Sequence, residues 1–244
     1  MRLPTWGEVE TKVRADLDLQ DSDNFVTQDE MAGYGNEGID AAEVLIMATH
    51  EDYFLNSATL SLVSGERSIA LPTDIYGQKV RGITYINGSR IYPLKEIKDP
   101  EIFYKKAIAD YQANGNDEYG YIFKSATAGE QDKLMISPPA QESGAYLEMW
   151  YIRNANRIPL QAAPDSASRA TQVATVIDIP EWRAYIEQFI KWRCYQKMKD
   201  QGAEASAAAA LEKLGELMVI NLKDRKLNNE NEIEMDVSHY VEHS

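Results

Sequence analysis

The sequence predicts an α+β protein in which a four-helix bundle, formed by the N- and C-terminal segments, carries an inserted, mostly antiparallel β-domain and an extended C-terminal tail. Apolar residues recur at helical spacing before residue 56 and again after residue 178. Between residues 57 and 162 the period changes to two, which is typical of strands. We therefore expect four segments, whose ranges are 1–56, 57–162, 163–222 and 223–244.

Two capping boxes open the predicted helices of the first segment. Thr5 and Glu8 form one box, and Thr27 and Glu30 form the other. In each box the threonine side chain accepts from the amide at the third helical position, and the glutamate accepts from the threonine amide. We expect the second helix to extend to about Phe54.

The second predicted helix contains three closely spaced glycines, Gly33, Gly35 and Gly38. Each costs about 1 kcal/mol relative to alanine within a helix. Their G-x-G-x-x-G spacing occurs in phosphate-binding loops, but such a loop follows a strand, and here a helix cap comes first. The glycines therefore indicate close packing of a neighbouring element.

The inserted segment has the pattern of a β-domain of about seven strands with one short helix. We expect a hairpin between Ala58 and Pro72, and a second hairpin that turns at Asn87-Gly88. Asp99-Pro100 opens the short helix. Three more strands are predicted at 120–124, 133–137 and 145–153.

The third segment begins with a connector rich in Ala, Ser and Thr, residues 162–175. A long helix is predicted from Asp178 to Gly202, and another from Ala203 to Leu222. Their short connection predicts an antiparallel helical hairpin, which completes the bundle with the two N-terminal helices.

The last segment is polar but alternates regularly with period two. Ile233, Met235, Val237, His239 and Val241 are separated by acidic or polar residues and Tyr240. The alternation predicts a strand that pairs with a sheet edge on another chain. A frayed acidic tail is the alternative.

Charge and cysteine content exclude several classes of function. Lys and Arg total 25 against 39 Asp and Glu, a net charge of −14, which argues against tight nonspecific binding to nucleic acid. The same charge serves solubility, or a surface past which DNA slides without sticking. The single cysteine, Cys194, excludes an intramolecular disulfide and a four-cysteine zinc site, and its apolar helical surroundings predict burial.

The sequence contains no established catalytic motif, and we expect no cofactor, metal or catalytic residue. His50 is the one histidine within the predicted folded region. Acidic pairs such as Glu51/Asp52 and Asp117/Glu118 arise freely in so acidic a chain, so they identify no hydrolase. The start of the chain lacks a secretory pattern, and no apolar run approaches the length of a membrane span, which fits synthesis in the cytoplasm of a host cell.

Several short motifs resemble the head-to-tail adaptor (connector) proteins of tailed bacteriophages. One is Asn-Glu-Gly-Ile-Asp-Ala-Ala at 36–42, followed by Glu-Asp-Tyr-Phe at 51–54. Others are Leu-Val-Ser-Gly at 62–65, Ile-Ala-Leu-Pro-Thr-Asp at 69–74 and Lys-Val-Arg at 79–81. The resemblance is best over residues 5–93, weaker over 145–222, and nearest to the adaptor and tail-tubular proteins of short-tailed phages.

This resemblance implies a structural virion protein without enzymatic activity. Such adaptors form a ring, commonly of twelve copies, in the neck between the capsid portal and the tail. The implied partners are other copies of the chain, the portal protein and the tail nozzle or tail tube protein, with no membrane. Double-stranded DNA would pass through the lumen without specific binding. Tails of this family often dock on the portal, which assigns that role to Glu232, Ile233, Met235, Val237, His239, Tyr240 and Val241.

Two other functions fit the composition. A carboxylate-based hydrolase of cell-wall polymer would use one of the many Asp/Glu pairs. A carbohydrate-binding tail component would stack sugars on Trp150 or Tyr151, whose positions equally suit the core of a sheet.

Overall fold

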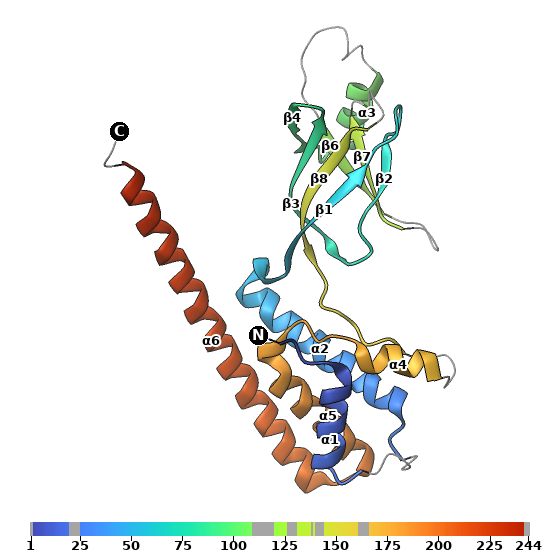
Figure 1. Cartoon of the computed structure of the whole chain (residues 1–244), viewed down its shortest axis with the longest axis vertical. Coiled ribbons are helices and arrows are strands. Elements are labelled where there is room, and N and C mark those ends of the chain that lie inside the picture. The colour runs from blue at the N-terminus through green and yellow to red at the C-terminus, as the bar shows by residue number, and fades with distance from the viewer. Residues whose placement is uncertain are drawn as a thin grey trace. The chain divides into compact units, whose positions relative to one another are not determined.

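The computed structural model describes residues 2–19, 25–108, 120–125, 131–137, 139, 144–160 and 166–241, with the backbone alone at 105–108, 166–167 and 225–241 (Figure 1). The chain divides into two compact units. The helical unit comprises Met1–Tyr53 and Ala155–Ser244, and the inserted unit comprises Phe54–Asn154. The sequence-based boundaries were 56/57 and 162/163.

The helical unit is built from α1 (Trp6–Asp16), α2 (Gln28–Thr49), α4 (Ser166–Ala174), α5 (Arg183–Met198) and α6 (Gln201–Val241). Both predicted capping boxes are confirmed. The Thr5 amide donates to the Glu8 carboxylate at 3.2 Å, and the Thr27 amide donates to Glu30 at 2.9 Å. The Glu30 amide in turn donates to the Thr27 hydroxyl oxygen at 3.2 Å.

Two of the three glycines in α2 lie where a neighbouring side chain approaches closely. A Cβ on Gly35 would meet the Trp6 ring and Ile158 Cδ1, each at 2.7 Å. A Cβ on Gly38 would meet Phe189 at 3.3 Å, whereas Gly33 faces open space. The prediction of close packing is therefore confirmed at Gly35 and Gly38.

The predicted connector at 162–175 is wrong, because α4 occupies much of it. This helix packs against α1, and its Arg169 Nη2 lies 2.6 Å from Oε2 of buried Glu10. The described part of the unit thus contains five α-helices, and the predicted four-helix arrangement does not account for α4. The Ala/Ser/Thr composition hid a short helix that is held in place by its tertiary contacts.

The turn between α5 and α6 lies three residues earlier than predicted. Lys199 adopts the left-handed conformation at φ 59°, and Gly202 lies inside the first turn of α6. The Asp200 carboxylate accepts from the Ala203 amide at 3.1 Å, as an N-cap side chain does.

The predicted extended tail is also wrong, since α6 continues to Val241. Neither Gly nor Pro occurs after Gly215, so no residue there breaks a helix. The alternating pattern was ambiguous, because Ile233, Val237 and Val241 are spaced by four residues, which suits a helix as well as a strand.

The inserted unit contains two four-stranded sheets. One has the order β1-β8-β3-β4, with β1 at Leu55–Ser61, β8 at Tyr146–Arg153, β3 at Ile75–Asn87 and β4 at Arg90–Pro93. The other has the order β2-β7-β6-β5, with β2 at Ser68–Ala70, β7 at Lys133–Ser137, β6 at Gly120–Lys124 and β5 at Lys95–Glu96. Helix α3 (Pro100–Ile108) lies between β5 and β6 in the chain. Only the short β5–β6 pair is parallel among the pairings of the named strands.

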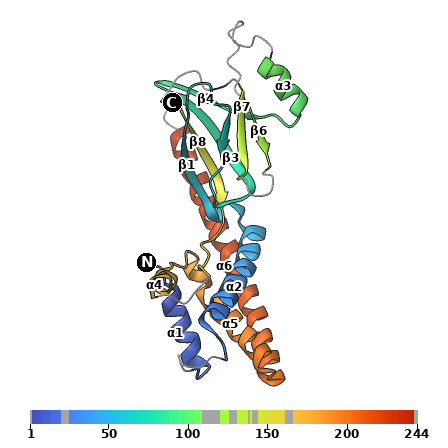
Figure 2. The same ribbon diagram turned by 90° about the vertical axis from the view of Figure 1, so that its right-hand side faces the viewer.

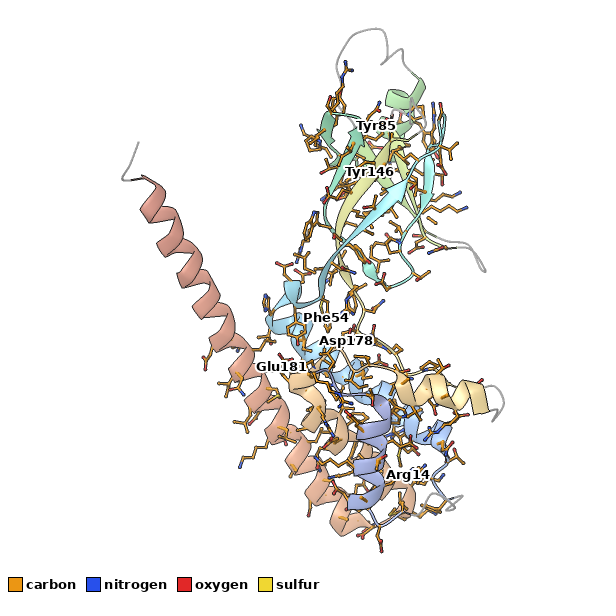
Figure 3. All side chains as sticks on the ribbon, in the orientation of Figure 1. Arg14, Phe54, Tyr85, Tyr146, Asp178 and Glu181 are labelled. Atoms are coloured by element: carbon orange, nitrogen blue, oxygen red, sulfur yellow. The ribbon has the colours of Figure 1, made fainter. Side chains whose placement is uncertain are left out.

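The first predicted hairpin is wrong and the second is confirmed. β1 pairs with β8 and β2 with β7, so the turn around Gly65 carries the chain from one sheet to the other. β3 and β4 pair directly, with Asn87 opposite Arg90 and Gly88 at φ 59° in the turn. Both sheets contribute to one core, which contains Tyr85 (Figure 3), Leu134 and Leu147.

Candidate assembly surfaces

Buried ion pairs fix the relative positions of the helices within the helical unit. On α1, Glu10 lies 3.1 Å from Arg14 as well as 2.6 Å from Arg169 of α4 (Figure 3 labels Arg14). Glu187 of α5 is 3% exposed and lies 2.6 Å from both Lys12 and Arg183. Because each buried carboxylate has two cationic partners, removal of the carboxylate would deprive two cations of this counter-charge at once. These ion pairs join α1, α4 and α5, and we call the three helices the platform.

A third buried glutamate anchors the chain where it returns from the inserted unit. Glu43 Oε1 accepts from the Ala155 amide at 2.6 Å, and Glu43 Oε2 accepts from Arg157 at 2.6 Å. Just beyond, Asn36 forms two hydrogen bonds with the backbone of Ile158, at 2.8 and 2.9 Å. The returning segment is therefore fixed to α2 from its first residue.

An open groove of about 520 Å³ lies beside α6 on the helical unit. We call it the α6 groove; its apolar lining comes from three helices and includes Leu45, Tyr185, Trp192, Leu211, Gly215 and Val219. A Cβ on Gly215 would lie 3.4 Å from the Tyr185 ring and 3.6 Å from Leu45, so α6 packs closely on both residues at this point. Glu212 and Glu216 are exposed at the margin.

A second surface, which we call the α6 ridge, lies on another side of the same helix. It consists of Lys213, Leu217, Ile220 and Asp224, all exposed. Leu217 is 46% exposed and Ile220 is 54% exposed. No prediction from the sequence covered either surface. The available signal was that Leu217 and Ile220 lie off the stripe formed by Ala207, Leu211, Leu214, Met218 and Leu222.

The structure places the seven predicted portal-docking residues, from Glu232 to Val241, together at the C-terminal end of α6. Figures 1 and 2 show this helix running beside α5 and continuing past it. Leu222 is the last residue of α6 with a described buried side chain. The backbone continues as helix to Val241, and we call residues 223–241 the arm.

The histidine, the cysteine and the acidic residues that could support catalysis or metal binding have the following environments. His50 ends α2, where its amide donates to the Ile46 carbonyl at 2.7 Å and its ring meets Tyr53 edge-on. Burial raises the pKa of the Cys194 thiol to about 11. Within the part of the chain that the structure describes, no three His, Cys, Asp or Glu side chains gather in a metal-binding arrangement. The pair Asp117/Glu118 lies outside the described residues.

The two aromatic residues considered for sugar binding have different environments. Tyr151 is 3% exposed, and its hydroxyl donates to Asp74 at 2.9 Å. Burial, followed by the hydrogen bond to Asp74, raises the pKa of Tyr151. Trp150 is 46% exposed. Of the pair, Trp150 alone is accessible for stacking.

Within the described ranges, no helix combines the length and the apolar content that crossing a membrane requires.

Comparison with known proteins identifies the family. A family model described as SU10 adaptor protein matches residues 4–231, which include both units and most of α6. The match covers both stretches that resemble phage head-to-tail adaptors. A comparison with curated proteins finds no match. The extent of the family match is nearly the whole chain, and we conclude that the chain belongs to the SU10 adaptor protein family.

Proposed function

We propose that this protein is a head-to-tail adaptor of a tailed bacteriophage, and that twelve copies form a ring between the portal and the tail. The observation that carries the proposal is the adaptor family match, which extends through both units. The platform of helices joined by buried ion pairs suits a ring component, because it presents its surfaces in fixed positions.

We assign portal docking to the C-terminal arm of α6. Residues 223–241 correspond to about 28 Å of helix at 1.5 Å per residue. The arm contains the docking residues Glu232, Ile233, Met235, Val237, His239, Tyr240 and Val241. Because Ile233, Val237 and Tyr240 follow helical spacing, the arm suits a groove between helices of the portal.

The inserted unit would then face the tail nozzle or tail tube protein, and the ring would enclose the channel for the genome. A net charge of −14 per chain makes the ring repel the phosphate backbone. Repulsion lets double-stranded DNA pass without being held, which suits both packaging and ejection. In this role the protein is a virion component of the neck and needs no catalytic residue.

Truncation of the arm tests the docking assignment. A chain that ends at Leu227 should lose binding to the purified portal ring, measured by co-sedimentation. A chain that ends at Val241 provides the control and should bind like the full chain. Circular dichroism and the melting temperature would establish that the truncated protein keeps its other helices. Equal binding by the Leu227 truncation and the full chain would overturn the assignment.

A further inference from the structure

We propose that the free edge of β1 pairs with an extended segment of the tail nozzle protein, which joins the sheet of the inserted unit as an added strand. This contact rests on the proposed function, which places the tail against the inserted unit. Among the described strands, β1 pairs only with β8 and therefore lies at the end of its sheet (Figure 2).

The hydrogen-bonding pattern shows which backbone groups of β1 face the open edge. The strand pairs with β8 in one antiparallel register over all seven of its residues. One position beyond the strand, the Leu62 amide donates to the Ala145 carbonyl at 3.0 Å. Hydrogen-bonded pairs alternate along an antiparallel ladder, so the even-numbered residues of β1 bond to β8 and the odd-numbered residues do not. The N–H and C=O groups that point away from β8 belong to Leu55, Ser57, Thr59 and Ser61.

The strand β1 lacks the features by which edge strands avoid pairing with other chains. Protected edges are usually short, charged, bulged or interrupted by proline. The sequence of β1, Leu-Asn-Ser-Ala-Thr-Leu-Ser, contains no charged residue and no proline, and its register with β8 has no shift. At about 3.3 Å per residue it presents roughly 23 Å of regular edge. This edge is therefore suited to an added strand.

The side chains of β1 define the pattern that the partner strand needs. Ala58 and Leu60 are partly buried at the margin of the core between the two sheets. Ser57 and Thr59 are exposed on the opposite face. A strand added beside β1 continues the same pleat, so its residues on the core side would cover Ala58 and Leu60. The matching partner is an extended segment in which apolar residues alternate with polar ones.

A second copy of this chain offers no matching edge within the proposed ring. The other terminal strands of the two sheets, β2, β4 and β5, have three, four and two residues. On β4 the outward-facing groups belong to Ile91 and Pro93, and proline has no amide to donate. Because β1 has one free edge, pairing between two β1 strands needs a twofold axis, whereas neighbours in a ring are related by rotation about the ring axis. The occupant is therefore a strand of the nozzle protein.

Proline substitution tests the pairing, because it removes one outward-facing amide. Thr59→Pro should weaken binding of the full chain to the purified nozzle protein of the same phage at least about tenfold, measured by biolayer interferometry. The Thr59 amide does not bond to β8, so the variant should keep the circular dichroism and the melting temperature of the unmodified chain. Ile91→Pro removes an outward-facing amide from β4, at the other end of the same sheet. It is the matched control and should bind like the unmodified chain.

Hydrogen exchange provides a second measurement, which needs no substitution. In the free chain the amides of Ser57, Thr59 and Ser61 should exchange faster than those of Ala58 and Leu60, which donate to β8. Binding of the nozzle protein should slow exchange at the three odd-numbered residues at least about tenfold. If Thr59→Pro failed to fold, this comparison and the variant Ser57→Pro would decide the question.

The outcomes separate this contact from the rest of the proposed function. Unchanged nozzle binding by folded Thr59→Pro, or unchanged exchange at Thr59 on binding, would overturn the strand pairing. Dimers of the free chain that dissociate on Thr59→Pro would overturn it in favour of a second copy at this edge. If the unmodified chain binds the portal ring and not the nozzle protein, the strand pairing fails and portal docking stands. If it binds the nozzle protein through β1 and not the portal ring, the pairing stands and portal docking fails.

Discussion

Glu43 and Arg157 form an ion pair at 2.6 Å that ties the middle of α2 to the segment returning from the inserted unit. The Glu43 side chain is 5% exposed, while the Arg157 side chain is 35% exposed. The second oxygen of Glu43 accepts from the Ala155 amide at 2.6 Å. Both carboxylate oxygens are thus satisfied at the place where the chain re-enters the helical unit.

Glu43→Gln should lower the free energy of unfolding by about 2 kcal/mol, because the uncharged amide leaves the Arg157 guanidinium without its buried partner. Asp40→Asn is the matched control. Asp40 contacts the same Arg157 nitrogen at 2.6 Å, but its side chain is 60% exposed, and its loss should cost less than about 0.5 kcal/mol. Urea unfolding followed by circular dichroism measures both. Equal losses of unfolding free energy in the two variants would show that burial does not determine how strongly a carboxylate stabilises the protein through Arg157.

Gly35→Ala should destabilise the helical unit by about 1–3 kcal/mol. The new methyl group would meet the Trp6 ring and Ile158 at 2.7 Å, which requires the packing between α1 and α2 to shift. Gly33→Ala, two residues away in the same helix, meets nothing within 4 Å and should gain about 1 kcal/mol from helix propensity. Thermal unfolding of the two variants should move in opposite directions. A stabilised Gly35→Ala would contradict the packing described for this face of α2.

Lys199→Gly should stabilise the protein by about 1 kcal/mol, since Lys199 adopts a left-handed conformation between α5 and α6 that glycine tolerates without strain. Lys199→Ala removes the same charge but keeps a Cβ, and should stay within about 0.5 kcal/mol of the unmodified chain. Chemical unfolding distinguishes the two. If both variants gained equally, the charge and not the backbone would be responsible.

Cys194 should resist thiol reagents in the folded protein at pH 8 and react once the chain unfolds. Its side chain is fully buried, and burial raises the pKa of its thiol from 9.0 to about 11. A raised pKa means that the folded form keeps its proton where the unfolded form has lost it. The associated stability is complete below about pH 9 and is lost as the pH rises towards 11.

The measurement is the unfolding free energy between pH 8 and pH 11 for the unmodified chain and for Cys194→Ala. Buried tyrosines such as Tyr185, whose pKa burial also raises, add to the alkaline loss in both proteins. The variant should therefore lose less stability over this range than the unmodified chain. Identical profiles would mean that the thiol titrates equally in both states.

Local sequence signals anticipated much of the fold. The capping boxes at Thr5 and Thr27 were readable because all their partners lie within three residues. Gly88 turns the β3–β4 hairpin for the same local reason. The incorrect predictions concern pairings between distant segments, which a local pattern does not determine. Between Leu55 and Ala70, alternation marked two strands correctly but could not show that they belong to different sheets.

The candidate surfaces were less predictable, because they depend on which helices meet. Trp192 and Leu211 have the spacing of core residues, and only the packing of α2, α5 and α6 in three dimensions shows that both line an open groove. The prediction of an extended C-terminal tail was wrong for a different reason. A spacing of four residues is common to strands and helices, and the absence of a helix breaker decided in favour of α6.

Native mass spectrometry of the purified chain, with and without the portal ring of the same phage, tests the adaptor account as a whole. We expect the portal ring to acquire a stoichiometric set of twelve copies. A chain that remains strictly monomeric in both conditions would contradict the account.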